Sequence, residues 1–244
     1  MERKMQRLIA SLTLWIKEKV IAANGKGVVV GMSGGVDSSA VAALCQFAFP
    51  HSTLGVIIPC YSNETDEIHA KLVAGKFGIV TKTIVLDEVL DSLLEILPKS
   101  DLDVATKKLA QVNLKPRLRM VVLYYLANCL GYLVVGASNK SELSIGYFTK
   151  HGDGAADLFP LGNLFKTQIY ELATYLDIPR EIVSKPPSAG LWAGQADEVE
   201  LGLTYTELDQ YLATGEAGKE LKQKIDSMIN ENTHKRSIGA IPDF

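Results

Sequence analysis

The chain has 244 residues, of which 47% are hydrophobic and 22% are charged, and its formal net charge is −3. This composition is that of a globular protein, which excludes a disordered chain, a collagen and a disulfide scaffold. The slightly acidic balance provides no overall basic field, so we expect neither nucleic acid nor a membrane surface as a partner. The length favours a single domain over residues 1–244, without room for a second enzymatic domain.

Short apolar runs alternate with helical patterns through the first half of the chain. The patterns predict helices at 5–22, 38–47, 66–77, 88–97 and 115–130, and strands at 27–31, 54–59, 80–85 and 132–136. Strands that alternate with helices through short connections predict an α/β fold, a doubly wound, Rossmann-like parallel sheet with helices on both faces. Ligands of such sheets bind beyond the carboxyl ends of the strands.

The stretch from Met120 to Asn139 contains no charged residue and is long enough to span a bilayer. However, it contains Asn128 and three tyrosines, and its pattern changes from helix to strand at Gly131. We therefore interpret it as a buried helix followed by a strand. Later in the chain, Gly- and Asp-rich segments predict ordered binding loops between helices at 166–176, 204–213 and 216–232.

The three cysteines, Cys45, Cys60 and Cys129, form neither a CxxC pair nor a pattern with histidines at metal-binding spacing. An odd, scattered set is typical of reduced thiols, so we expect a cytoplasmic protein. Cys45 and Cys129 lie in apolar helical stretches and are interpreted as core residues. The N-terminal segment is charged and amphipathic and has no signal-peptide pattern.

The most specific local signal is Gly31-Met-Ser-Gly-Gly-Val-Asp-Ser-Ser39, between a strand and a helix. Gly34 and Gly35 let the backbone approach a ligand closely, and the helix start offers free N–H groups and a positive dipole end. The loop has neither the lysine of a Walker A motif nor a GxGxxG pattern. It predicts a phosphate-binding site, the alternative being a tight strand–helix turn without a ligand.

Asp37 lies within this predicted phosphate loop. A carboxylate beside a phosphate is repelled unless a cation such as Mg²⁺ lies between them. Asp37 is therefore either a Mg²⁺ ligand or a partner of the helix dipole, and the loop by itself leaves both interpretations open.

The segment SGGVDSS resembles the pyrophosphate loop of the N-type ATP pyrophosphatases, which adenylate a substrate oxygen and release pyrophosphate. Further segments, in their order and spacing, resemble the NAD synthetases of the ammonia-dependent form. These segments are 113–120, 136–142, 146–157, 164–167, 185–198 and 234–236. The likeness runs from about residue 5 to the end and implies an adenine nucleotide alpha hydrolase-like fold.

The resemblance implies a ligase that amidates deamido-NAD to NAD, the last step of NAD biosynthesis. ATP, deamido-NAD and ammonia are the implied substrates, Mg²⁺ the cofactor, and AMP and pyrophosphate the by-products. It also implies a homodimer with the deamido-NAD site at the interface, for which the apolar helix after Arg117 is the candidate surface. Longer relatives carry a glutaminase domain with a catalytic cysteine, for which this chain has no candidate, so free ammonia is the expected nitrogen donor.

The resemblance also assigns roles to residues. The expected ATP contacts are Gly31, Met32, Ser33, Gly34, Gly35, Val36, Asp37, Ser38, Lys166 and Ser188. The expected Mg²⁺ ligands are Asp37 and Glu142, and the expected catalytic residues are Lys166 and Asp153, the latter for positioning ammonia or the adenylate. The expected deamido-NAD contacts are Arg117, Lys150, Asp157, His234 and Lys235.

Several residues have a second interpretation. Arg117 and Asp157 are alternatively surface ion-pair partners, whereas a lysine at a helix start is locally unfavourable, which favours a functional role for Lys166. Tyr147 and Phe148 are interpreted as core residues rather than nucleotide platforms. Ala137 stands where relatives commonly have threonine, so one expected ATP contact is absent.

Two alternatives to this ligase remain from the sequence. One is a nucleotide-binding module that binds ATP without releasing pyrophosphate. The other is a different amidating pyrophosphatase, such as a GMP synthetase or a tRNA-thiolating enzyme, although the acidic pI near 5.9 argues against a tRNA substrate.

Overall fold

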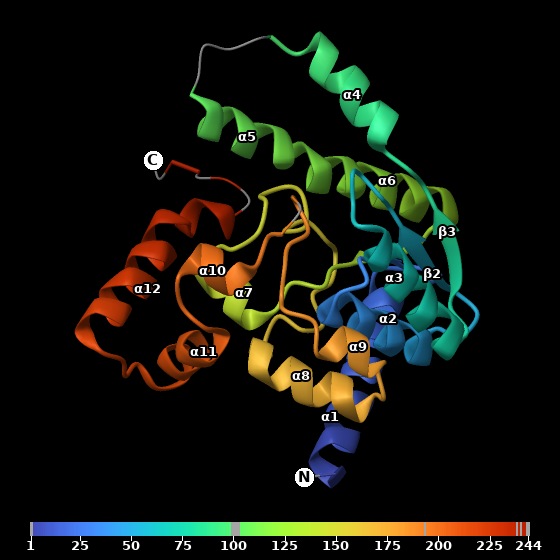
Figure 1. Cartoon of the computed structure of the whole chain (residues 1–244). Coiled ribbons are helices and arrows are strands. Elements are labelled where there is room, and N and C mark those ends of the chain that lie inside the picture. The colour runs from blue at the N-terminus through green and yellow to red at the C-terminus, as the bar shows by residue number, and fades with distance from the viewer. Residues whose placement is uncertain (1, 99–102, 193, 238, 240, 243–244) are drawn as a thin grey trace.

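A four-stranded parallel sheet forms the centre of the computed structural model, which describes residues 2–98, 103–192, 194–237, 239 and 241–242 (Figure 1). The strands are β1 (Val28–Gly31), β2 (Thr53–Ile57), β3 (Val80–Thr83) and β4 (Leu133–Val135), in the order β3–β2–β1–β4. The valines of β1 are fully buried because this strand is central and covered on both faces.

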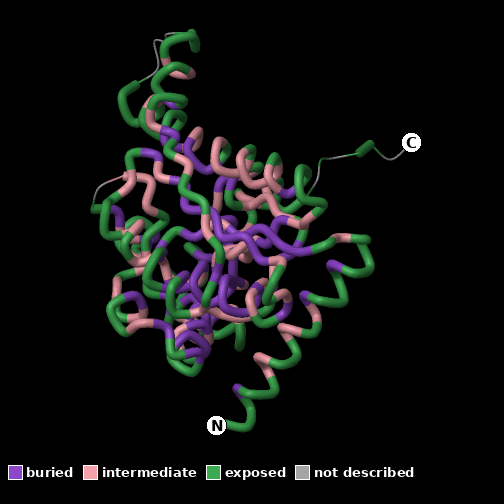
Figure 2. Tube along the Cα trace, turned by 90° about the vertical axis from the view of Figure 1, so that its right-hand side faces the viewer, coloured by how far each residue is buried: buried purple, intermediate pink, exposed green. Residues whose placement is uncertain are grey.

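Helices cover both faces of the sheet, as the sequence predicts. One face packs against α1 (Glu2–Ala22), α2 (Val36–Ala48), α3 (Glu64–Phe77) and α8 (Lys166–Tyr175). The other packs against α4 (Asp87–Ile96) and α6 (Leu114–Leu130). In Figure 2 the buried residues collect around the sheet, whereas the first turns of α1 project with mostly exposed residues.

The strand order determines where a ligand can enter. From β1 the chain proceeds outward to β2 and β3, and then returns to place β4 on the other side of β1. The carboxyl ends of β1 and β4 therefore form a topological switch point, where loops diverge and leave a crevice. The loop after β1 carries residues 31–38, and the segment after β4 leads to Glu142.

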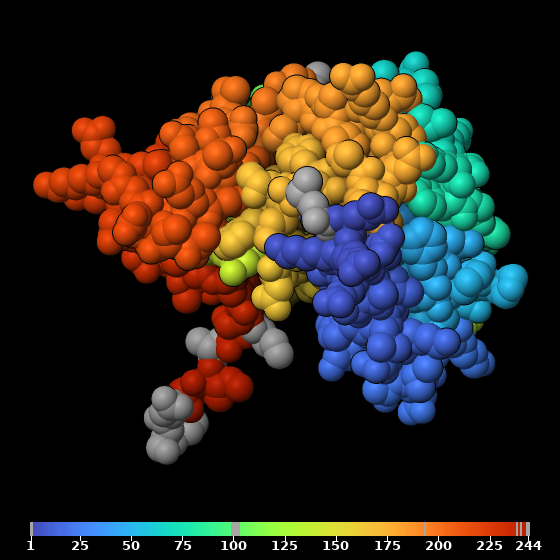
Figure 3. All heavy atoms as spheres, turned by 90° about the horizontal axis from the view of Figure 1, so that it is seen from below, coloured from blue at the N-terminus to red at the C-terminus, as the bar shows by residue number. Residues whose placement is uncertain are grey.

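A smaller helical region follows the sheet and has its own apolar core. It comprises α7 (Lys140–Ile145), α10 (Asp197–Leu201), α11 (Tyr205–Thr214), α12 (Lys219–Glu231) and the 3₁₀ turn η1 (Thr233–Lys235). The short helix α9 (Arg180–Val183) instead packs beside α8, and its Ile182 belongs to the same core as α1, α2, α3 and α8. Figure 3 shows that the C-terminal helices form one side of the molecule, with α8 between them and the lower-numbered helices. α5 (Val104–Val112) lies next to α6.

The predicted elements agree with the structure to within a few residues at each end. The short helices α5, α7, α9 and α10 have no counterpart among the predictions. Helices of four to nine residues are too short to display a full amphipathic period, and α7 depends on a capping box between Asn139 and Glu142.

Two expectations for α6 are wrong. The helix is apolar but not buried throughout, because its outer side leaves Val121 57% and Tyr125 67% exposed. Cys129 is likewise exposed, whereas Cys45 and Cys60 are buried. The hydrophobic residues surround the whole helix, and the single sheet face can cover only one side of it. Among the helices of the described residues, none combines the length and apolar character needed to cross a membrane.

Candidate functional site

The loop after β1 has the backbone that its glycines predict. Gly34 has φ +75°, and a Cβ there would stand 2.2 Å from the backbone oxygen of Asp66. Ser33 and Ser38 join their hydroxyls at 2.9 Å, and Ser38 Oγ also donates to the carbonyl of Gly35. Gly35, the N-cap of α2, provides no side-chain cap, so the first N–H groups of the helix remain available for an anion.

Lys166, Asp37 and Glu142 converge beside this loop. Lys166 Nζ lies 2.5 Å from Asp37 Oδ2 and 3.3 Å from Glu142 Oε1, although the three residues belong to α8, α2 and α7. The lysine is 3% exposed. A buried lysine requires charged partners, and this one has two. The structure therefore brings together the predicted metal ligands and the predicted catalytic lysine.

Asn139 connects the two carboxylates and is fully buried. Its Oδ1 accepts the backbone N–H of Glu142 at 3.0 Å, and its Nδ2 donates to Asp37 Oδ1 at 3.0 Å. The same amide thus caps α7 and orients the carboxylate of the phosphate loop. Asn139 was not among the predicted site residues, although its position three residues before Glu142 is the signal of a capping box.

The electrostatics of the group follow from its burial. Burial raises the pKa of Glu142 to about 7, although the neighbouring Lys166 lowers it. Burial alone lowers the pKa of Lys166, but the Asp37 and Glu142 carboxylates outweigh this effect and the pKa is raised. The lysine is therefore a permanent cation at neutral pH.

A small pocket of about 100 Å³ adjoins this charged group and contains most of the predicted catalytic centre. Its lining comprises Asp37, Glu142, Tyr147, Asp153, Lys166, Ser188, Ala189 and Asp197. Ser188, Lys166 and Asp153 were predicted from distant segments, and the fold places them around one space. The interpretation of Tyr147 as a core residue is confirmed, because it is partly buried and packs against the core of the C-terminal helices, and the same residue also lines this pocket.

Asp197 and Tyr205 also belong to this site, and neither was among the predicted site residues. Asp197 is 3% exposed, and its carboxylate accepts hydrogen bonds from Tyr147 Oη, Tyr205 Oη and the backbone N–H of Ala189. The ring of Tyr205 lies 5.2 Å from Lys166 Nζ, within range of a cation–π contact. No sequence signal distinguishes these residues from ordinary helix residues, because their partners are distant in the chain.

Asp153 lines the pocket, and the residue as a whole is exposed to solvent. Its Oδ1 accepts the backbone N–H of Thr149 at 2.9 Å, and desolvation raises the pKa of this carboxyl group. The hydroxyl of Ser138 donates to the Asp153 carbonyl at 3.3 Å, so it does not replace the hydroxyl that is absent at Ala137.

Four of the five predicted deamido-NAD contacts form a basic group beside Asp153. Arg117 Nε donates to the Lys150 carbonyl at 3.2 Å, and Lys150 Nζ donates to the His234 carbonyl at 2.5 Å. Lys235 Nζ donates to the carbonyls of Gly146 and Phe148. Burial lowers the pKa of Lys235, and the carboxylate of Asp153 partly offsets this effect.

Asp157 is not joined to this basic group by any hydrogen bond or ion pair among the described residues. Its carboxylate instead accepts the N–H of Val134 at 2.7 Å and the hydroxyl of Tyr124 at 3.2 Å. It thus lies between β4 and α6. A contact of Asp157 with the same substrate remains a prediction.

The donor set fits a magnesium ion bound together with phosphates. Asp37 and Glu142 place two carboxylates around one cation position, now taken by the lysine ammonium. Mg²⁺ is commonly held by one or two carboxylates, with substrate phosphates and water completing the shell. Within the described residues there is no group of three or more His, Cys, Asp or Glu side chains able to hold a metal alone.

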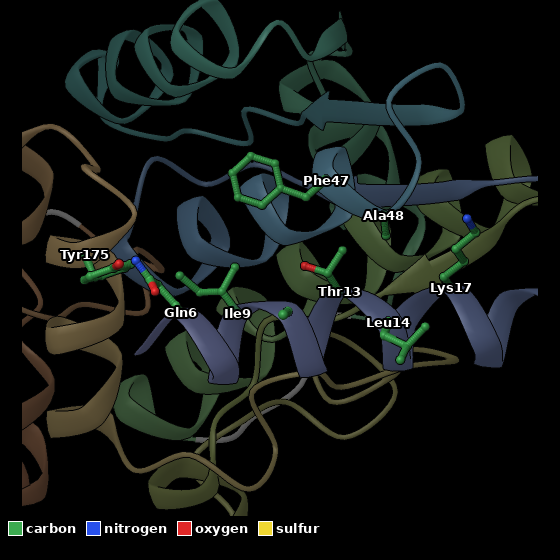
Figure 4. Close-up of a pocket in the computed structure, with 9 residues that line it drawn as sticks. Gln6, Ile9, Thr13, Leu14, Lys17, Phe47, Ala48 and Tyr175 are labelled. Atoms are coloured by element: carbon green, nitrogen blue, oxygen red, sulfur yellow. The ribbon is translucent and has the colours of Figure 1, made fainter. Parts of the chain in front are cut away.

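A larger groove of about 530 Å³ lies elsewhere, between α1, α2 and α8 (Figure 4). Ile9, Leu14, Phe47 and Tyr175 are among its mostly apolar lining residues. None of the predicted site residues lines it. Its size alone gives it no catalytic character, since it has no cluster of polar groups directed at one point.

Comparison with known proteins places this site in a family. A family profile described as NAD synthase matches residues 8–239. The NH(3)-dependent NAD(+) synthetase of Carboxydothermus hydrogenoformans is 47% identical over 99% of this chain and 97% of its own length. A solved NMN synthetase from Francisella tularensis superposes with a TM-score of 0.91 at 34% identity, covering 98% of this chain and 99% of that one.

A second solved structure, the NH3-dependent NAD synthetase of Campylobacter jejuni, superposes with a TM-score of 0.82 at 28% identity and covers 98% of this chain and 99% of that one. Sequence and structure thus agree over nearly the whole length. The chain belongs to the NAD synthase family.

Proposed function

We propose that this protein is a ligase that uses ATP and ammonia to amidate deamido-NAD to NAD. The observation that carries the proposal is the convergence of Lys166, Asp37 and Glu142 beside a phosphate loop at the switch point of the sheet. The curated relatives at 40–48% identity, which are named NH(3)-dependent NAD(+) synthetases, support the same reaction. The activity is the last step of NAD biosynthesis.

The chemistry explains the charge arrangement. A carboxylate is a poor acyl donor, so its oxygen first attacks the α-phosphorus of ATP, and pyrophosphate leaves. This step requires in-line positioning and neutralisation of phosphate charge. The N–H groups at the start of α2 and the Lys166 ammonium provide positive charge, and Ser188 lines the same pocket as Lys166. When bound by Asp37 and Glu142, Mg²⁺ supplies further neutralisation of the phosphates.

In the second step ammonia attacks the adenylated carbonyl, and AMP leaves. Ammonia must arrive neutral, and its attack yields a proton that a base has to accept. Asp153 has a carboxyl group with a raised pKa, lies on the same pocket as Lys166 and carries no ion pair among the described residues. We assign it to orient ammonium and accept its proton.

A product assay tests the proposal. Purified protein with ATP, Mg²⁺, deamido-NAD and ammonium should form NAD, AMP and pyrophosphate in equal amounts. Formation of ADP and phosphate would contradict attack at the α-phosphorus. Binding of ATP without pyrophosphate release would instead support a non-catalytic nucleotide-binding module. Replacing ammonium by glutamine in a parallel reaction should abolish the product.

A second candidate substrate is the mononucleotide that has the same pyridine carboxylate. The observation that favours it is the close superposition on the NMN synthetase of Francisella tularensis. The amidation chemistry is identical, and only contacts beyond the first phosphate differ. Rates measured with the dinucleotide and the mononucleotide as competing substrates distinguish the two. A higher kcat/KM for the mononucleotide would make it, and not deamido-NAD, the proposed substrate.

The proposal also includes a single-domain cytoplasmic enzyme that acts as a homodimer. The free cysteines support a reducing compartment. The exposed apolar side of α6 and α5 supports an interface, because Val104, Leu109, Val121 and Tyr125 are all more than half exposed there. The ammonia-dependent relatives, which this chain covers almost entirely, support free ammonia as the nitrogen donor.

A further inference from the structure

Asp209 is a buried carboxylate on α11 that has no part in the proposed mechanism. It is 5% exposed. Its oxygens accept hydrogen bonds from the Ser141 hydroxyl, from the backbone N–H of Thr167 at 2.9 Å and from the Thr167 hydroxyl at 2.8 Å. No cationic side chain lies within ion-pair distance of it in the described residues. A buried carboxylate without a cation depends on such donors.

The donors of Asp209 lie on the two helices that carry the charged centre. Ser141 immediately precedes Glu142 on α7, and Thr167 immediately follows Lys166 at the start of α8. The Ser141 hydroxyl also accepts the backbone N–H of Lys166 at 2.9 Å. One side chain of α11 therefore ties together the N-terminal turns of α7 and α8.

The carboxylate of Asp209 stabilises the start of α8. The N-cap residue Phe165 forms no side-chain cap, and a lysine in the first turn opposes the helix dipole. The negative charge of Asp209 offsets this effect and satisfies the N–H of Thr167. Tyr205, one turn earlier on the same face of α11, places its ring 5.2 Å from Lys166 Nζ. α11 thus contacts the ammonium of Lys166 through Tyr205, and it holds the backbone of the next residue, Thr167, through Asp209.

We infer that Asp209 is a positioning residue that sets the place of Lys166 relative to Glu142. The inference rests on the proposed ATP-dependent amidation and adds to it a role for α11. A lysine side chain has several rotatable bonds, so its ammonium is held in place only if its backbone is held as well. Displacement of a catalytic group by about 1 Å can reduce a rate by roughly 100-fold. The tie between Ser141 and Thr167 prevents such a displacement.

Two variants of Asp209 separate positioning from charge. Asp209→Ala removes all three hydrogen bonds that the carboxylate accepts, and we expect kcat to fall by roughly 10- to 100-fold. The KM for deamido-NAD should stay within about twofold, because its predicted contacts lie in the separate basic group. Asp209→Asn retains an acceptor for Thr167 and a donor for Ser141, and we expect it to recover kcat to within about threefold of the parent.

The matched control is Asp226→Ala. Asp226 lies on α12 in the same helical region and accepts a hydrogen bond from Tyr211 at 2.5 Å, away from Lys166. We expect its kcat to equal that of the parent. All variants are assayed well below their own melting temperatures, so that unfolding makes no contribution. Affinity for an ATP analogue with a methylene between its α and β phosphates, measured by calorimetry, should fall in Asp209→Ala and recover in Asp209→Asn.

A double-mutant cycle tests the route through Ser141. If Asp209 acts through this hydroxyl, Ser141→Ala and Asp209→Ala together should lower kcat by less than the product of their separate effects. Multiplicative effects would overturn this route. A folded Asp209→Ala variant with parental kcat would overturn the inference while leaving the proposed function intact. Absence of pyrophosphate release by the unmodified protein would instead overturn the proposed function itself.

Discussion

At the scale of single residues, opposing effects act on the charge of the Glu142 carboxylate. Lys166 lies within 3.3 Å of this carboxylate and stabilises its charge, whereas burial and the nearby Asp37 disfavour that charge. The Lys166 ammonium thus occupies the cation position between the two carboxylates, where we expect Mg²⁺ to bind together with ATP. We expect it to turn toward the phosphates of bound ATP and leave the two carboxylates to Mg²⁺.

The raised pKa of Glu142 predicts a pH dependence of metal binding. With a pKa of about 7, this carboxyl group exchanges a proton for Mg²⁺ in acidic solution. Its affinity for Mg²⁺ with a non-hydrolysable ATP analogue should therefore fall by about tenfold per pH unit below about 7 and remain constant above it. The same group binds its proton more tightly in the folded than in the unfolded state. For this group alone, the ligand-free protein therefore gains stability as the pH falls from about 7 toward 4.5.

Calorimetric titrations from roughly pH 5.5 to 8, on either side of a pKa of about 7, check this dependence. Glu142→Gln is the matched variant, because it has nearly the same shape and does not titrate. It should bind Mg²⁺ weakly at every pH and lose the slope. An unchanged slope in Glu142→Gln would assign the proton to another group.

At the scale of elements, the phosphate loop depends on α3 as well as on its own glycines. Gly34 has a positive φ, and its α-carbon faces the backbone of Asp66 near the start of α3. The side chain of Asp66 in turn forms an ion pair with Lys185, which precedes the Ser188 segment. The start of α3 thus contacts both the phosphate loop and the segment that leads to Ser188, which lines the pocket.

Substituting Gly34 by alanine tests this packing. The new Cβ would stand 2.2 Å from the Asp66 carbonyl oxygen, in a backbone region that alanine disfavours. We expect a loss of roughly 1–3 kcal/mol in the free energy of unfolding and a weakened affinity for ATP. Urea denaturation and calorimetry measure the two effects.

The control for Gly34→Ala is Gly75→Ala. Gly75 lies within α3, and a Cβ there would meet no atom within 4 Å. Alanine is favoured over glycine inside a helix, so this change should stabilise the fold by about 0.5–1 kcal/mol. Equal stability changes in the two variants would show that the contact with Asp66 has no energetic effect.

At the scale of the whole molecule, α6 has two different sides. Its inner side packs on the sheet with α4, while its outer side exposes Val121 and Tyr125 to solvent. An exposed apolar surface of this extent is typical of an interface. The opposite face of the sheet, with α1, α2, α3 and α8, belongs to a different core.

The outer side of α6 predicts a dimer that a single charge can disrupt. Light scattering at micromolar concentration should give twice the chain mass of 26.5 kDa. Tyr125→Asp should shift the population to the monomer, because a charge buried at an interface without a partner is unfavourable. Ile68→Asp is the control, since Ile68 is 60% exposed on α3, across the sheet. A dimer lost equally in both variants, or retained in both, would exclude α6 as the interface.

Much of this architecture was predictable because its signals are local. The apolar run before Gly31 and the glycines after it specify a buried strand and a phosphate loop through their own backbone preferences. The same local signals place most strands and long helices. Lys166, Glu142 and Asp153 were also predicted as site residues, but through resemblance of whole segments and not through any contact between them.

What the sequence by itself determined is therefore the alternation of strands and helices and the glycine-rich loop between the first strand and its helix. Only the tertiary structure decided that Asn139 joins Asp37 to Glu142, that Asp209 ties α7 to α8, and that α6 is covered on one side only. The reason is physical: the partners of Asp209 are 42 and 68 residues distant, and no local preference encodes such a contact. These contacts exist because packing around the sheet brings the helix ends together.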